Sequence, residues 1–192
     1  NSKLLNGKNV IGAVLGMKIP PVERYLAGYI AGAKSVNPAV DVRYIVTGTF
    51  SDRAKGKEAT IALIDQGADI VIQLAGLTGM GVVDAARERK IFTIGADVDQ
   101  NPAAPDYVLT SALKGTTVAT LLTIKDFAAG KLKGGQNRVF GIAEGAIDLA
   151  PFHQHDGIVP AAVKSAIAKA KTDIASGKVK VPSTLAELGI RK

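Results

Sequence analysis

The chain has 192 residues, of which 47% are hydrophobic and 21% charged, and this balance is typical of a globular domain and excludes a disordered chain. It holds no cysteine, so disulfides and thiolate metal sites are excluded, and no apolar run reaches the roughly 18 residues of a membrane span. The formal net charge is +7, but the lysines are scattered and do not alternate with aromatic residues, which predicts solvated lysines and no nucleic-acid surface.

Strand patterns and helix patterns alternate along the chain. Residues 9–15 form an apolar run that predicts a strand, and Pro20 and Pro21 open an amphipathic helix to residue 36, because proline is tolerated at a helix start. The further predicted elements, in chain order, are strand 42–46, helix 53–66, strand 68–75, helix 78–89, strand 91–94, strand 107–113, helix 116–130, strands 138–143 and 146–149, and helix 158–176. Short strands separated by helices indicate an α/β fold with a doubly wound, parallel, Rossmann-like sheet.

A carboxylate follows the apolar strand at residues 91–94. This strand runs into Gly95, Ala96 and Asp97, and strand 107–113 ends at Lys114. In an open α/β sheet, ligands bind at the carboxyl ends of the strands. An aspartate backed by a lysine suits a neutral polyol such as a sugar or ribose, and it does not suit a phosphate.

A glycine-rich loop, residues 75–81, follows the predicted strand 68–75 and opens the next helix. The spacing of Gly76, Gly79 and Gly81 is not that of the dinucleotide fingerprint. Three interpretations stay open: a dinucleotide site, a tight strand-to-helix turn capped by Thr78, and a backbone contact to an uncharged ligand. We favour the backbone contact.

Two residues near the end of the second predicted strand have competing interpretations. Phe50 could stack on a base or a sugar face, or it could be a core residue that covers the helix start. Asp52 is predicted to cap the helix that begins at residue 53.

Catalytic and metal-binding patterns are weak. His153 and His155 could share a metal, but no carboxylate cluster with ligand spacing surrounds them. Glu144 and Asp148 lie on one hairpin-like segment and would need a cleft to act as a catalytic pair. The sequence contains no nucleophile elbow and no P-loop, so we expect no catalytic residue, no metal and no cofactor.

The order of these sequence blocks resembles the basic-membrane-protein family. These proteins are substrate-binding lipoproteins of ABC transporters, and the group includes bacterial purine-nucleoside receptors. The resemblance covers nearly all of the chain and runs through residues 16–25, 28–33, 36–38, 48–52, 67–69, 75–81, 95–100, 109–114 and 177–182.

The resemblance implies the ribose-type (type 1) periplasmic binding protein fold, in which two Rossmann-like lobes close on a ligand. By this analogy Phe50 stacks on a purine, the backbone of Gly76 lies against the ligand, and Asp97 holds ribose hydroxyls with support from Lys114. Met17 lies where the first strand meets the cleft, and it departs from the Gly-Gly pair common there. The implied ligand-binding set is Met17, Phe50, Gly76, Thr78, Asp97 and Lys114.

The family's first lobe would precede Asn1, so the resemblance implies that the chain is the second lobe with a returning segment. Independently of the resemblance, the start Asn1–Lys3 is itself typical of a processed or excised end. Residues 1–113 and 138–192 would form the ligand-binding lobe, and residues 114–137 a hinge and a helix that packs on the first lobe. We expect a second copy, as a homodimer, or a swapped segment to cover the apolar stripe of that helix, which consists of Val118, Leu121, Leu122 and Phe127.

The resemblance therefore implies a binding module and not an enzyme. The expected function is the solute-binding component of an ABC transporter, with a nucleoside of the purine type as ligand and a permease as partner. The expected location is extracytoplasmic, with the full-length precursor anchored to the membrane as a lipoprotein. Two alternatives stay open: a ligand-sensing regulatory protein of the same fold, and a nucleotide-dependent enzyme that binds phosphate at the glycine-rich loop.

Overall fold

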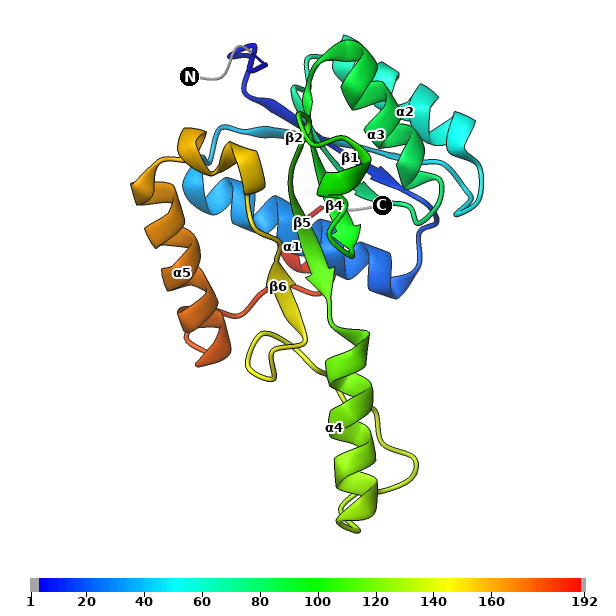
Figure 1. Cartoon of the computed structure of the whole chain (residues 1–192), viewed down its shortest axis with the longest axis vertical. Helices are drawn as coiled ribbons and strands as arrows, with labels where there is room; N and C mark the ends of the chain where they lie inside the picture. The colour runs from blue at the N-terminus through cyan, green and yellow to red at the C-terminus, as the bar shows by residue number, and fades with distance from the viewer. Residues whose placement is uncertain (1–3, 191–192) are drawn as a thin grey trace.

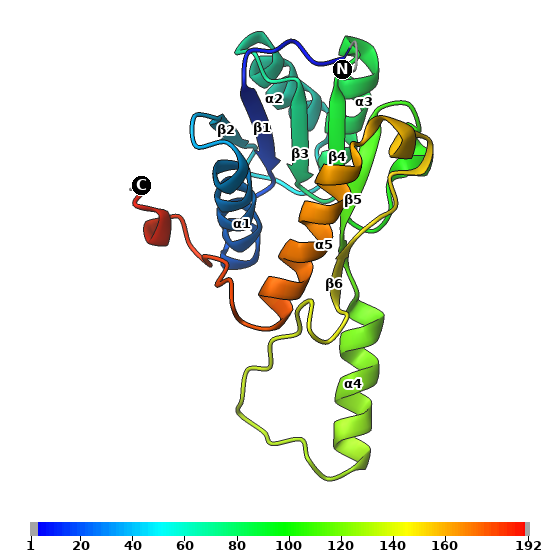
Figure 2. The same cartoon turned by 90° about the vertical axis from the view of Figure 1, so that its left-hand side faces the viewer.

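The computed structural model describes residues 4–190, so the prediction for Asn1–Lys3 lies outside the described residues. A six-stranded sheet in the order β2-β1-β3-β4-β5-β6 forms its centre, with α1 and α5 on one face and α2 and α3 on the other (Figures 1 and 2). The strands are β1 Val10–Leu15, β2 Asp41–Val46, β3 Ile70–Leu74, β4 Phe92–Asp97, β5 Val108–Lys114 and β6 Ile147–Leu149. The helices are α1 Pro20–Val36, α2 Arg53–Asp65, α3 Gly79–Arg89, α4 Thr116–Ala128 and α5 Ala161–Ala175, with short 3-10 helices η1 Asn101–Ala103, η2 His153–Ile158 and η3 Ala186–Leu188.

The predicted α/β fold with a doubly wound sheet is confirmed, with one correction to its strand directions. Strands β1 to β5 pair in parallel, but β6 pairs antiparallel to β5, with Leu149 opposite Ala112. The strand at residues 146–149 was expected within a parallel sheet. It is antiparallel because the chain leaves the sheet along β5 and returns beside the same strand (Figure 2).

The apolar pattern of the strands divides the core between the two faces of the sheet. Val14 points into a cluster with Leu63 under α2 and α3, while its neighbour Leu15 points into a cluster with Leu26 under α1. Successive side chains of a strand face opposite sides, so a strand buried on both faces reads as a continuous apolar run. This accounts for the near absence of alternation in β1 and β3.

Two other predicted elements differ from the structure. Residues 138–143, predicted as a strand, contain no strand, and instead the carboxylate of Glu144 accepts a hydrogen bond from the Gly141 N–H at 2.7 Å. A strand needs the backbone of a neighbour, and Figure 2 shows this segment in a loop that stands clear of the sheet. The helix predicted from residue 158 begins at Ala161, because Pro160 holds Val159 in an extended conformation.

Helices α2 and α3 touch backbone to backbone. A Cβ added at Gly56 would lie 1.9 Å from the carbonyl oxygen of Thr78, and one added at Gly81 would lie 2.0 Å from that of Arg53. Arg53 also donates two hydrogen bonds to the carboxylate of Asp84 on α3, at 2.5 and 2.7 Å. These contacts fix the start of α2 against the first turns of α3.

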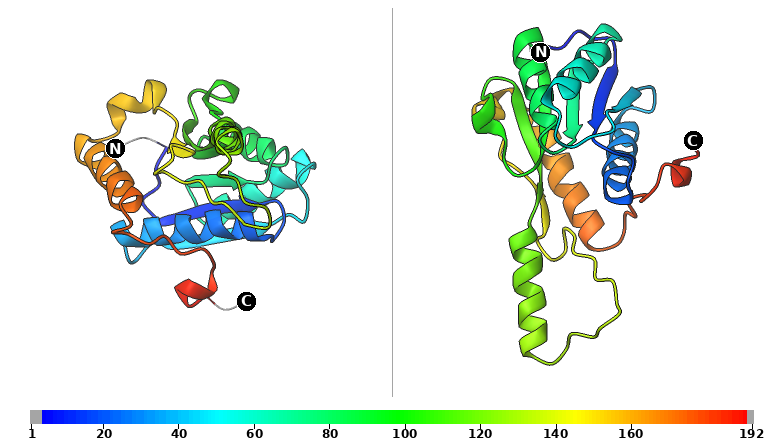
Figure 3. Two further views of the ribbon diagram at one scale, coloured as in Figure 1. Left: turned by 90° about the horizontal axis from the view of Figure 1, so that it is seen from below. Right: turned by 90° about the vertical axis from the view of Figure 1, so that its right-hand side faces the viewer.

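Helix α4 projects from the carboxyl edge of the sheet and buries none of its residues (Figures 1 and 3). Leu121, Ile124 and Phe127 are 51%, 58% and 74% exposed, whereas Val118 and Leu122 of the predicted stripe are half-buried. The exposed apolar face therefore includes Ile124, which the predicted stripe left out. Within residues 4–190, no helix combines the length and the apolar character that crossing a membrane requires.

Candidate functional site

The carboxyl ends of the strands bring most of the predicted site residues to one edge of the sheet. Met17 follows β1, Phe50 follows β2, Gly76 follows β3, Asp97 ends β4 and Lys114 ends β5. Because β1 to β5 are parallel, these ends meet at the same edge. Residues that end or follow five strands therefore lie along one edge of the sheet.

The Phe50 ring packs against the two glycines that follow β1 and β3, Gly16 and Gly76. A Cβ at Gly16 would fall 2.2 Å from Cδ1 of the Phe50 ring, and a Cβ at Gly76 would fall 3.6 Å from the same atom. The ring therefore packs on Gly16, where a larger residue would clash with it. Phe50 itself is half-buried. The backbone carbonyl of Phe50 accepts a hydrogen bond from the Thr78 N–H at 3.1 Å, which joins it to the glycine-rich loop.

Asp97 ends β4 in a left-handed backbone conformation with φ of +71°. Such a conformation is uncommon outside glycine and is often found at functional sites. One carboxylate oxygen lies 2.5 Å from Nζ of Lys114, and the two side chains are 47% and 48% exposed. The hydrogen bond to Asp97 raises the pKa of Lys114, so the lysine is charged at neutral pH. The pair is a neutral, strongly polar unit that is open to solvent.

A tyrosine that the sequence reasoning missed lies close to this ion pair. Burial raises the pKa of Tyr25 on α1, the negative charge of Asp97 raises it further, and Lys114 partly offsets the increase. The Tyr25 hydroxyl is buried and has no hydrogen-bond partner within residues 4–190. The hydroxyl of Tyr29, one helical turn later, is also buried and also has no hydrogen-bond partner within residues 4–190. Their i, i+4 spacing resembles that of ordinary core residues, so the pattern gave no sign of a site.

Met17 and Gly76 lie at the open edge, but the side chain of Thr78 does not. Met17 is 40% exposed, and Gly76 is exposed with φ of +56°. Thr78 is completely buried, and its hydroxyl accepts a hydrogen bond from the Asp52 N–H at 2.9 Å. Thr78 was expected among the ligand contacts or as a side-chain cap of α3. Instead it binds the start of α2, while Asp52 caps that helix as predicted, accepting from the Lys55 N–H at 3.1 Å.

A second group of polar residues was missed beneath the same edge. Gln73, Gln100 and Ser111 are joined by hydrogen bonds although they come from β3, the β4–η1 loop and β5. Gln73 is 1% exposed in the middle of an apolar strand. A buried glutamine in such a run is a signal of a polar network, because a buried amide needs partners.

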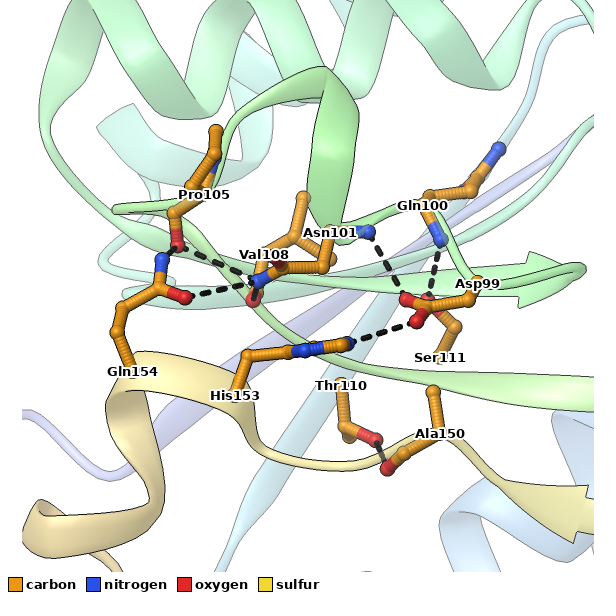
Figure 4. A network of polar contacts seen from close by, with 10 residues as sticks. All are labelled: Asp99, Gln100, Asn101, Pro105, Val108, Thr110, Ser111, Ala150, His153 and Gln154. Carbon is orange, nitrogen blue, oxygen red and sulfur yellow. Dashed lines mark hydrogen bonds and ion pairs between the residues drawn. The ribbon is translucent and has the colours of Figure 1, made fainter.

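The two histidines are engaged separately. His153 Nε2 lies 2.7 Å from a carboxylate oxygen of Asp99 (Figure 4). His155 is buried, with its Nε2 2.9 Å from the Pro105 carbonyl oxygen and its ring edge-on to Phe92. In the part of the chain that the structure describes, no three His, Cys, Asp or Glu side chains come together as metal ligands. Both histidines fasten the η2 segment to the loop between β4 and β5.

Comparison with known proteins decides the family. The sequence matches the family of PnrA-like ABC transporter substrate-binding proteins over residues 3–184. The chain belongs to this family. Among curated relatives, it is 36% identical over 195 residues to the ABC transporter nucleoside-binding protein BmpA of Lactococcus lactis, and 36% identical over 142 residues to Basic membrane protein D of Borreliella burgdorferi. The resemblance to the basic-membrane-protein family is thus confirmed.

A solved structure supports the same fold. The chain superposes on an ABC transporter solute-binding protein of Aeropyrum pernix with a TM-score of 0.80 at 27% identity, covering 92% of this chain and 59% of that one. The two curated alignments cover 91% and 72% of this chain but 53% and 42% of the relatives. The chain therefore spans about half the length of the relatives it matches.

Proposed function

We propose that this chain is the ligand-binding lobe of an ABC transporter solute-binding protein that takes up a purine nucleoside between two lobes. The proposal is supported by the convergence of Phe50, Gly76, Asp97 and Lys114 at the carboxyl edge of the sheet and by the nucleoside-binding relative. Helix α4 and the loop that follows it, residues 114–137, would belong with the other lobe.

Each residue has a role in this proposal that follows from its surroundings. The ring of Phe50, held by Gly16, would stack on the base. The bare backbone of Gly76 would let the ligand approach closely, and the Asp97 carboxylate would accept hydrogen bonds from two ribose hydroxyls. Met17 would contribute an apolar contact at the end of β1. Thr78 would act indirectly, by holding the backbone of Phe50 and Asp52.

The half-exposed Asp97–Lys114 pair is the observation that carries the choice of ligand. The carboxylate attracts hydroxyl donors and repels a phosphate, while the ion pair with Lys114 holds it in place. A nucleotide would bring negative charge to an ion pair that has no net positive charge to neutralise it. A nucleoside is therefore favoured over the nucleotide ligand of an enzyme.

Calorimetry on the two-lobe protein that contains this chain tests the proposal. Titration with inosine, guanosine and adenosine should give binding, and the corresponding 5′-monophosphates should bind at least tenfold more weakly. Asp97→Ala removes one partner of a charged hydrogen bond, which typically costs about 2–5 kcal/mol, so nucleoside affinity should fall at least tenfold. Equal affinity for nucleosides and nucleotides, or an unchanged affinity in Asp97→Ala, would contradict it.

A role in transport implies one further partner, the permease of the transporter. A receptor of this kind delivers its ligand to a transporter permease from the outer side of the membrane. We therefore propose an extracytoplasmic protein whose full-length precursor is anchored as a lipoprotein. Cell fractionation with the permease co-expressed checks this placement.

A further inference from the structure

A hydrogen-bonded pair of side-chain amides, one buried and one half-buried, joins the two loops at the candidate site. The Gln73 side-chain oxygen accepts a hydrogen bond from the Ala75 N–H at 3.0 Å, and its Nε2 donates to Oε1 of Gln100 at 2.8 Å. The same oxygen of Gln100 accepts from the Ala96 N–H at 3.2 Å. The network therefore ties the backbone immediately before Gly76 to the backbone immediately before Asp97.

The backbone donors leave only one orientation for both amides. Ala75 offers an N–H, so Gln73 must turn its oxygen toward it, and its NH₂ group then faces Gln100. Gln100 must present its oxygen to two donors, and its own NH₂ group points at the sulfur of Met80, 3.7 Å away. The Ala75 N–H fixes the orientation of the Gln73 amide, and the Gln73 NH₂ group fixes that of Gln100, so the network has a single arrangement.

Two glycines keep the space that this network occupies. A Cβ at Gly79 would lie 1.9 Å from Oε1 of Gln73, and a Cβ at Gly95 would lie 2.4 Å from the Ser111 hydroxyl and 2.7 Å from Oε1 of Gln100. The Ser111 hydroxyl in turn accepts from the Gln100 N–H at 3.0 Å, which fixes the loop to β5. Neither glycine has a positive φ, so packing and not backbone conformation requires them.

We propose that Gln73 and Gln100 are positioning residues, which hold Gly76 and Asp97 at the spacing that ligand binding needs without touching the ligand. The inference rests on the proposed function. Gln73 is 1% exposed and lies below the loop, so the ligand reaches it only through the backbone that it holds. Without the amide pair, the loops after β3 and β4 would lose the side-chain hydrogen bonds that join them.

Leucine replacements in the two-lobe protein test this role. Gln73→Leu and Gln100→Leu should each weaken inosine binding about tenfold, and the double variant should be little worse than either one, because both remove the same link. The matched control is Thr93→Val, which removes a buried 2.8 Å hydrogen bond from β4 to the Val71 carbonyl of β3, deeper in the same pair of strands. It should lower the melting temperature as the glutamine variants do but leave inosine affinity within about twofold.

A purely structural role would make all three single variants alike in affinity, and that result would overturn the proposal. Gln100 is only half-buried, so Gln100→Leu gives a decisive result even where Gln73→Leu does not fold. Hydrogen exchange of the unliganded chain separates this inference from the choice of ligand. Segments 75–80 and 95–101 should both exchange faster in the glutamine variants and not in Thr93→Val. If the wild-type protein binds no nucleoside but both segments exchange faster in the glutamine variants, the proposed function is refuted and the link between the two loops is kept. Unchanged exchange in the glutamine variants would refute that link.

Discussion

At the scale of single residues, the two tyrosines of α1 are the unsatisfied groups of the described chain. The hydroxyls of Tyr25 and Tyr29 are buried without a hydrogen-bond partner within residues 4–190, and a buried unpaired hydroxyl costs about 1–3 kcal/mol. Tyr25→Phe and Tyr29→Phe should therefore raise the free energy of unfolding at pH 7 by about 1 kcal/mol each. Urea unfolding measures this, with the half-buried Tyr44→Phe as the control for a change near zero.

The same tyrosines make the protein sensitive to alkali. Burial raises the pKa of both hydroxyls above the ordinary value of 10.0. A group whose pKa is raised by folding contributes stability that is complete below its unfolded pKa and is lost as the pH rises toward its folded pKa. Stability should therefore fall above about pH 10, and less steeply in the two Phe variants. The pKa of Lys114 is also raised, so part of the loss of stability at high pH should remain in both Phe variants. Parallel pH profiles for wild type and variants would contradict the burial of the hydroxyls.

At the scale of elements, the contact between α2 and α3 is the most sensitive to added volume. Gly81→Ala would place a Cβ 2.0 Å from the Arg53 carbonyl oxygen and 2.6 Å from the Lys57 nitrogen, and backbone atoms cannot move aside by changing rotamer. The free energy of unfolding should fall by about 1–3 kcal/mol. Gly32→Ala on α1 is the matched control, because nothing lies within 4 Å of its Cβ, and it should stabilise by about 0.5–1 kcal/mol. Equal effects of the two changes would mean that α2 and α3 do not touch.

Elements also show what the sequence can and cannot predict. The periodicity of residues 9–15 or 53–66 reports local burial, and these elements were predicted nearly to the residue. Residues 138–143 have the composition of a strand but no strand alongside them, and the direction of β6 depends on where the chain returns. Local periodicity predicts neither the presence of a neighbouring strand nor the direction in which a strand pairs. At the site, Asp97 stood out at a strand end, whereas the partners Gln73 and Gln100 are 27 positions apart and became visible only in three dimensions.

At the scale of the whole molecule, helix α4 presents an exposed apolar face. It covers 53% of BmpA, and α4 carries exposed Leu121, Ile124 and Phe127. Monomers rarely leave a large apolar patch open, so we expect a second copy or a swapped segment to cover this face when the 192-residue chain is isolated. Analytical ultracentrifugation should show self-association that increases with concentration. The double variant Leu121→Gln, Phe127→Gln should remain monomeric and keep the wild-type circular dichroism spectrum.

Ligand binding by the isolated chain follows from the same geometry. A cleft ligand gains most of its affinity from burial on two sides, but here Asp97 and Lys114 are about half exposed, and each hydrogen bond to the ligand competes with water for a net ~0.5–1.5 kcal/mol. In the proposed two-lobe site, Phe50 would offer stacking from one lobe only. The isolated chain should therefore bind inosine, guanosine and adenosine at least a hundredfold more weakly than the two-lobe protein, because the other lobe's contacts and the exclusion of water are both missing. Calorimetry on the two proteins measures the ratio. A monomeric chain with sub-micromolar nucleoside affinity would show that this lobe holds a complete site and that the two-lobe cleft is the wrong description.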